Sequence, residues 1–149
     1  MQRIGFKYND GGREAAGFKG DTGDCVTRAI AIATGEPYQK IYDDMNRIGK
    51  QERRSKNRSS KSTARGGVYK PTYHRYLLSL GWKWTPTMFI GQGCKVHLRK
   101  DELPKGTLIV SLSQHLATVV DGILQDTERC DRKGMRCVYG YYQQSEKTA

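Results

Sequence analysis

The sequence lacks any long hydrophobic run. No apolar stretch in its 149 residues approaches the roughly 18 residues that a membrane-spanning helix needs. Only 36% of the residues are hydrophobic. The first residues also lack the basic-then-apolar layout of a secretion signal. We therefore expect an intracellular protein with no membrane contact.

Cysteine and histidine are few, and none are spaced as structural zinc sites require. The cysteines Cys25, Cys94, Cys130 and Cys137 form no CxxC pair and no Cys/His ligand pattern. The sequence also has no Walker phosphate loop and no GxGxxG motif. No metal and no cofactor are therefore expected. Cys130 and Cys137 flank a short loop and would pair in an oxidising compartment, but two free thiols are favoured in a reducing cytosol.

Acidic residues are almost missing from one segment. The net charge is +11, and between Arg47 and Arg65 eight basic residues accompany a single acid. Residues 49–67 contain one alanine and no other apolar side chain, which predicts a basic mobile loop. Such a loop is either a solvated surface or an electrostatic contact for nucleic acid or an acidic protein partner, and without aromatics it offers no base stacking. The candidate contact residues are Arg53, Arg54, Lys56, Arg58 and Lys61.

The first half of the chain is predicted to be helical and the second half to be rich in strands. Apolar residues recur at spacings of three and four in residues 25–34, 36–49 and 71–82. A short strand is expected within residues 3–8, and period-two or continuous apolar runs predict strands near 95–98, 107–112, 115–120, 123–126 and 138–142. Helices followed by an antiparallel meander define one α+β domain over residues 1–149.

Cys25 begins the first predicted helix, in the stretch "GDTGDCVTRAIAIATG". The free amide groups and partial positive charge at a helix N-terminus lower the pKa of a thiol there. Taken alone, such a cysteine is more often a buried packing residue. A nucleophile would also need an imidazole and a group that orients it.

His115 and Asp126 are the candidates for those two groups. His115 opens a predicted strand, and Asp126 ends the next one, across the Asp121-Gly122 hairpin turn. In a two-residue hairpin Asp126 faces Ala117, which is one diagonal step from His115 on the same face of the sheet. The sequence therefore predicts a hydrogen bond between the two side chains and, with Cys25, a thiol active site.

Three pieces of the chain, "DTGDCVTRAI", "QHLATVVDG" and "ILQDT", resemble papain-like cysteine peptidases. The likeness is especially to the small single-domain bacterial and phage branch that includes the bacteriocin-leader peptidases. It implies a papain-like fold, in which N-terminal helices, the first carrying Cys25, pack on a C-terminal antiparallel sheet. By this resemblance Cys25 is the nucleophile, His115 is the general base and acid, and Asp126 orients the imidazole.

The sequence departs from that family before the cysteine. Papain-like enzymes usually carry a glutamine six residues earlier, which helps to hold the oxyanion, and here the position is Lys19. The backbone N–H of Cys25 remains one donor, because oxyanion holes often combine main-chain amides with a side chain. The candidates for the second donor are Lys19, Thr22 and Asn9.

The function expected from these residues is hydrolysis of a peptide, isopeptide or related amide bond through a Cys-His-Asp triad and an acyl-enzyme. The alternative is a catalytically inactive papain-like module that binds nucleic acid or an acidic protein through the basic residues 47–65. A peptide or protein is the expected substrate. Small size and the basic loop suit a bacterial or phage protein acting in the cytoplasm, which is the host cytoplasm for a phage.

Overall fold

The computed structural model describes residues 2–18, 23–51 and 62–144. Two of the oxyanion-hole candidates, Lys19 and Thr22, lie outside these residues. The same holds for the five basic candidates for partner binding, Arg53, Arg54, Lys56, Arg58 and Lys61.

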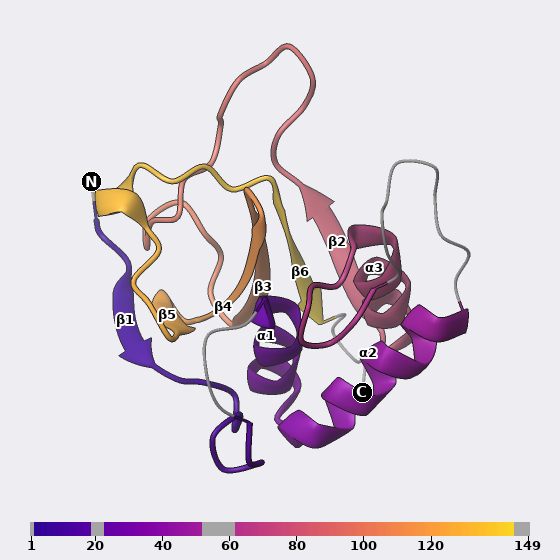
Figure 1. The fold of residues 1–149 in the computed structure, drawn as a ribbon. Coiled ribbons are helices and arrows are strands. Elements are labelled where there is room, and N and C mark those ends of the chain that lie inside the picture. Colours follow the sequence, from indigo (N-terminus) through magenta and orange to yellow (C-terminus); the bar gives the residue numbers. More distant parts are fainter. Residues whose placement is uncertain (1, 19–22, 52–61, 145–149) are drawn as a thin grey trace, which may run out of the picture.

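The described residues form an α+β arrangement of three α-helices and one six-stranded mixed sheet (Figure 1). The helices are α1 (Cys25–Thr34), α2 (Tyr38–Gln51) and α3 (Lys70–Ser79). The strands are β1 (Gly5–Tyr8), β2 (Trp82–Pro86), β3 (Thr107–Leu112), β4 (His115–Val120), β5 (Ile123–Asp126) and β6 (Gly140–Gln144), with a short 3-10 helix at Arg132–Gly134.

The strand order in the sheet is β1-β5-β4-β3-β6-β2. β1 pairs with β5 in parallel, and the other neighbours are antiparallel. α1 packs on the middle of the sheet, where the hydroxyl of Thr118 donates to the Ala29 carbonyl at 2.6 Å. This packing brings the N-terminus of α1 close to the beginning of β4.

Both faces of the central strand β3 are buried. Ile109 belongs to a core cluster shared with the three helices, whereas Leu108 and Val110 belong to a second cluster on the other face. The alternation follows from the two-residue period of a strand, which sends successive side chains to opposite faces. Because the centre of the sheet is packed on both faces, it holds the ends of β4 and β5 in fixed positions.

Several predicted elements are present at the predicted bounds. The helix at residues 25–34 is α1, and Gly35 ends it in the left-handed conformation at φ 73°. The strands at 107–112, 115–120 and 123–126 are β3, β4 and β5. The strand predicted at 95–98 was wrong, because that segment makes only isolated bridges such as His97 with Cys137.

The cysteine pairing differs from the expectation of free thiols. Cys94 and Cys137 form a disulfide with their Cα atoms 5.8 Å apart, and Cys25 and Cys130 are free. The bridges between Met88 and Cys94 and between His97 and Cys137 bring these segments together. This pairing could not be predicted from cysteine spacing, because the two cysteines are 43 residues apart.

The end of the predicted mobile loop is packed into the protein. Ser62 and Ala64 are buried, and the Ala64 carbonyl accepts a hydrogen bond from the Thr27 hydroxyl at 3.0 Å. Ala64 N–H in turn donates to Asn46 Oδ1 at 2.8 Å. Backbone hydrogen bonds and one alanine are therefore enough to fix residues 62–67 without a run of apolar side chains.

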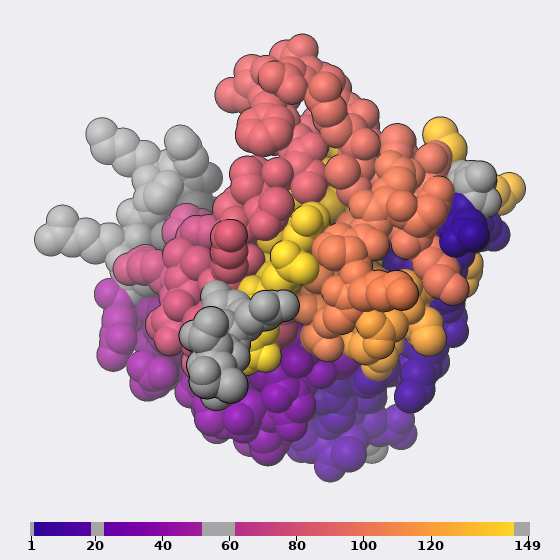
Figure 2. All heavy atoms as spheres, turned by 180° about the vertical axis from the view of Figure 1, so that it is seen from behind, coloured from indigo at the N-terminus to yellow at the C-terminus, as the bar shows by residue number. Residues whose placement is uncertain are grey.

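The segment between β2 and Cys94 projects from the rest of the molecule (Figures 1 and 2). Met88, Phe89 and Ile90 lie there with exposed side chains. None of the helices in residues 2–18, 23–51 and 62–144 is long and apolar enough to cross a bilayer.

Candidate active site

Cys25 is the first residue of α1 and lies beside the start of β4. Cys25, His115 and Leu116 line the same cavity, and interactions with His115 and with the Leu116 backbone lower the pKa of the Cys25 thiol. The backbone N–H of Cys25 is in the first turn of the helix, where amides have no intrahelical acceptor. The cysteine therefore meets an imidazole on one side and has the free amides of a helix end on the other.

His115 and Asp126 form a short hydrogen bond. The distance between His115 Nε2 and Asp126 Oδ2 is 2.6 Å. The pairing of Val120 with Ile123 and of Thr118 with Gln125 sets the register of this hairpin. That register is the one expected for a two-residue turn, and it places the two side chains on the same face. Since Nε2 bonds to Asp126, Nδ1 is the ring nitrogen that remains for Cys25.

A second set of bonds fixes the Asp126 carboxylate. Its Oδ1 accepts from the Thr127 backbone N–H at 2.7 Å and from Arg28 Nη1 at 2.8 Å. The Thr127 hydroxyl lies 2.8 Å from the same Arg28 nitrogen. With Oδ1 occupied in this way, Oδ2 is directed at the imidazole.

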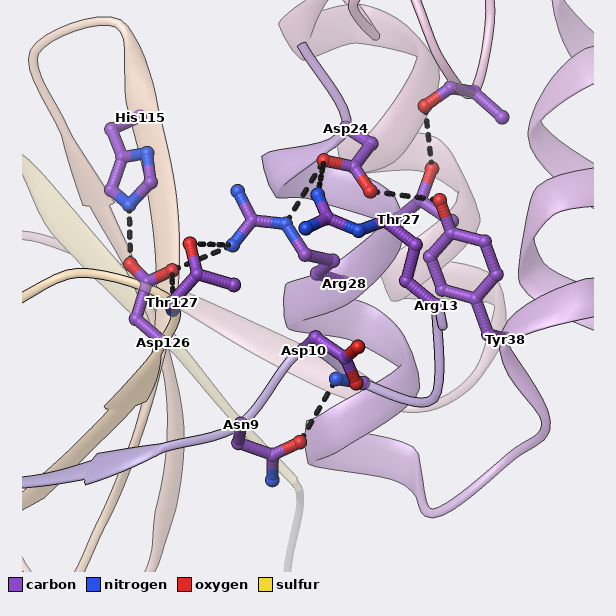
Figure 3. Close-up of polar contacts among 12 residues, drawn as sticks. Asn9, Asp10, Arg13, Asp24, Thr27, Arg28, Tyr38, His115, Asp126 and Thr127 are labelled. Atoms are coloured by element: carbon purple, nitrogen blue, oxygen red, sulfur yellow. Dashed lines mark hydrogen bonds and ion pairs between the residues drawn. The ribbon is translucent and has the colours of Figure 1, made fainter. Parts of the chain in front are cut away.

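Arg28 extends this network into the first turn of α1 (Figure 3). Its Nε donates to Asp24 Oδ1 at 3.0 Å, and the other carboxylate oxygen of Asp24 accepts from the Tyr38 hydroxyl at 2.8 Å. Arg13 approaches Asp24 at 3.3 Å. Asp24, which precedes the helix, thus holds Arg28 rather than capping the helix with its side chain.

The network shifts the pKa values of the three candidate catalytic groups. Burial raises the pKa of the Cys25 thiol, but the hydrogen bond and charge of His115 outweigh it, so the pKa is lowered. Burial opposes protonation of His115, but bonds to Asp126, Cys130 and Cys25 raise its pKa to about 11. Burial also disfavours the Asp126 carboxylate, yet His115, Thr127 N–H and Arg28 lower its pKa. The shifts of Cys25 and His115 both favour the thiolate–imidazolium form of the pair.

A cavity of about 540 Å³ opens on the Cys25 side of His115. Its rim is formed by the segment that follows the basic loop, including Gly66, Gly67 and Val68. α2 supports this segment, because a Cβ at Gly49 would overlap the Ser62 backbone carbonyl. The cavity is large enough for a few residues of an extended chain next to the thiol.

A second, more polar cavity of about 630 Å³ lies on the Asp126 side of His115. Cys130 and Thr127 line it, together with the four arginines Arg13, Arg28, Arg132 and Arg136. His115 is therefore accessible from two sides, one carrying the thiol and one carrying arginines.

The structure brings together Cys25, His115 and Asp126, but it does not bring Asn9 to them. The Asn9 amide donates to Gln125 Oε1 at 2.9 Å, and the side chain points away from His115 (Figure 3). Asn9 therefore does not supply the second oxyanion donor in this arrangement.

Two groups beside the thiol were missed by the sequence analysis. Tyr73 and Gln114 line the cavity of Cys25, and the charge of Cys25 contributes to the raised pKa of the Tyr73 phenol. Tyr73 belongs to the apolar stripe of α3, so its spacing indicated a core residue. Gln114 immediately precedes His115 in the tight turn of the "SLSQ" stretch, with φ 53°.

Comparison with known proteins adds no assignment, since no family model, no curated protein and no solved structure matches the chain.

Proposed function

We propose that this protein is a cysteine hydrolase that cleaves an amide bond in a peptide or protein. The observation that carries the proposal is that Cys25 and His115 line one cavity and that His115 Nε2 is 2.6 Å from Asp126 Oδ2. Each of the three groups has the partner that its role requires. The likeness of the surrounding motifs to papain-like peptidases agrees with this assignment.

In the proposed reaction, the Cys25 thiolate attacks the carbonyl carbon of the scissile amide. The C–N bond then breaks as His115 Nδ1–H gives its proton to the leaving nitrogen, which leaves a thioester on Cys25. Water attacks the thioester while His115 takes its proton, and the acid product leaves with the thiolate restored. Asp126 stays ionised throughout and holds the imidazole through Nε2.

The oxyanion formed in each attack needs hydrogen-bond donors. The Cys25 backbone N–H at the N-terminus of α1 is one, and the helix dipole favours negative charge there. Among the described residues that line the cavity, Thr63, Tyr69, Tyr73 and Gln114 carry neutral side-chain donors, and the pKa of Tyr73 responds to the charge of Cys25. Tyr73 would take the place of the glutamine that the family carries before its cysteine.

The test uses p-nitrophenyl acetate as a small acyl donor. We expect a burst of p-nitrophenol and an acetyl group on Cys25, located by peptide mass spectrometry. His115→Ala should slow acylation at neutral pH by at least about tenfold, since general base and ion-pair contributions are typically 10²–10⁴-fold. Free cysteine in solution is the control for ordinary thiol reactivity. Acetylation of Cys25 that is no faster than that of free cysteine, and that His115→Ala leaves unchanged, would overturn the proposal.

A further inference from the structure

Cys130 has no part in the proposed reaction, yet its thiol lies at the catalytic pair. It is free of disulfides, and its Sγ donates to Asp126 Oδ2 at 3.7 Å. The donor atoms of His115, Asp126 and Cys130 all lie within 4.8 Å of one another. They come from the beginning of β4, the end of β5 and the loop after it, which is why no sequence spacing revealed the cluster.

The chemistry of these three donors suits a zinc ion. Zinc takes imidazole nitrogen, carboxylate oxygen and thiolate sulfur at about 2.0–2.3 Å, and three protein ligands plus one open position are common. A tetrahedron with those bonds separates sulfur from oxygen by about 3.6 Å and nitrogen from oxygen by about 3.4 Å. The distance of 3.7 Å from Cys130 Sγ to Asp126 Oδ2 already fits. His115 Nε2, now 2.6 Å from the same oxygen, would move away by roughly 0.8 Å.

The charges and the surrounding bonds fit the same ion. A Cys130 thiolate and the Asp126 carboxylate together balance a 2+ charge, and a thiolate ligand disfavours magnesium and calcium. Arg28 and the Thr127 N–H hold Asp126 Oδ1, so Oδ2 stays directed into the cluster, as supporting hydrogen bonds do for metal ligands. Arg136 donates to the Cys130 carbonyl at 3.3 Å and so fixes the backbone of the third ligand.

The polar cavity supplies the fourth position. All three residues line it, so an exchangeable ligand has room to reach the metal. Four arginines, Arg13, Arg28, Arg132 and Arg136, and one further acid, Glu128, line the same space, so its lining is predominantly basic. This positive charge favours an anionic fourth ligand, such as chloride or hydroxide, over an additional cation.

We propose that His115, Asp126 and Cys130 bind a zinc ion, and that this ion switches off the thiol chemistry of Cys25. The binding stands on the geometry of the three donors, whereas the switching rests on the proposed function. Zinc would replace the proton between His115 Nε2 and Asp126 and the thiol proton of Cys130, and both protons would go to solvent. With Nε2 bound to metal, Nδ1 keeps its hydrogen and can no longer accept a proton.

Cobalt(II) chloride is the probe for the site, because a cobalt–thiolate bond gives a charge-transfer band in the near ultraviolet. We expect one equivalent of cobalt per chain and visible bands typical of a tetrahedral site. Cys130→Ser should lose the charge-transfer band, and the matched variant Cys25→Ser should retain it. Bands that survive in Cys130→Ser and vanish in Cys25→Ser would place the metal on the catalytic cysteine and overturn the proposal, as would the absence of binding.

A measurement on the unsubstituted chain covers the case in which Cys130→Ser fails to fold. Iodoacetamide labelling with and without one equivalent of zinc chloride should show Cys130 at least tenfold protected by the metal. Labelling of Cys130 that zinc leaves unchanged would overturn the site. The metal-free rate at Cys25 is read in the same experiment with EDTA, so a failed zinc site is distinguished from a failed thiol centre.

Discussion

Arg28 Nη1 lies 2.8 Å from Asp126 Oδ1, and this ion pair joins the helix that begins at Cys25 to the strand that ends at Asp126. Arg28 is three residues after Cys25, almost one turn along the same helix. Its guanidinium also reaches back to Asp24. A single buried cation thus ties together the segments that carry the two outer members of the candidate triad.

Replacing Arg28 with methionine should destabilise the fold strongly. The variant would remove one cationic partner from each of the buried carboxylates Asp24 and Asp126, which keep Arg13 and His115. Breaking a buried pair on one side costs about 3–5 kcal/mol, so we expect the free energy of unfolding in urea to fall by an amount near the lower end of that range. Lys40→Met is the matched control, because the Lys40–Asp44 pair is on the surface and contributes at most about 1 kcal/mol. Equal losses in the two variants would contradict the coupling role of Arg28.

Replacing Asp126 with asparagine should make Cys25 less reactive at mildly acidic pH. Asp126 is the largest of the contributions that raise the pKa of His115, and His115 in turn lowers the pKa of Cys25. Without the carboxylate, less imidazolium faces the thiol, so the pKa of Cys25 rises. Alkylation by iodoacetamide at pH 6 should then slow by about tenfold for each unit of that rise.

The pH profile should be measured with EDTA, which removes any metal from the three donors. Asp44→Asn is the control, because that carboxylate has a lowered pKa but lies on α2 away from the thiol. Its profile should overlay that of the natural chain. An Asp126→Asn profile that also overlays it would show that the His115–Asp126 bond does not tune Cys25.

The protonated imidazole should also stabilise the fold in a pH-dependent way. The pKa of His115 is about 11 in the folded chain, against about 6.5 for an unfolded histidine. A raised pKa means that the folded state binds the proton more tightly. The stabilisation is therefore fully present below about pH 6.5 and is lost as the pH rises toward 11.

This effect is best isolated in a Cys25→Ser/Cys130→Ser background, because both thiols lie beside the ring. The difference in unfolding free energy between this double variant and the same chain with His115→Gln should be largest near pH 6 and should shrink as the pH increases. Titrating groups that do not contact His115 cancel in that difference. A difference that grows between pH 6.5 and 9 would contradict the assigned direction of the shift.

Much of the triad geometry could be predicted because its signals are local. The apolar spacing after Cys25 fixed the first helix, and the Asp121-Gly122 turn fixed the register that places Asp126 near His115. What the sequence could not show are contacts between distant segments. The sequence analysis assigned no role to Arg28, although its guanidinium bonds to two carboxylates.

The errors have the same origin. Residues 95–98 alternate in polarity like a strand. They pair with the segment of Cys137 only through an isolated bridge, so they form no continuous ladder of strand hydrogen bonds. The strand β2 was missed because "WKWTP" is short and ends in proline, and its partner β6 is about 60 residues later along the chain. Cys130 looked like a loop thiol, since its position four residues after Asp126 gives no hint of a shared imidazole.

Replacing Gly49 with alanine should destabilise the protein, although the same change usually stabilises a helix. Alanine in a helix interior is favoured over glycine by about 0.5–1 kcal/mol. At Gly49, however, the added Cβ would overlap the backbone carbonyl of Ser62, and backbone yields less easily than a side chain. Overpacking of this kind costs about 1–3 kcal/mol, so we expect a net loss of about 1 kcal/mol or more.

The same variant tests whether the rim of the Cys25 cavity can be disturbed without changing the reactivity of the candidate triad. Ser62 begins the segment that continues to Gly66 and Gly67 at the rim, whereas His115 and Asp126 are on the sheet. The pH profile of Cys25 alkylation by iodoacetamide should therefore remain that of the natural chain while the urea midpoint falls. Gln51→Ala, at an exposed position at the end of α2, controls for a general effect of alanine in this helix. A Gly49→Ala protein as stable as Gln51→Ala would mean that residues 62–67 are free to move away from α2, and the rim would then not be a fixed wall of the site.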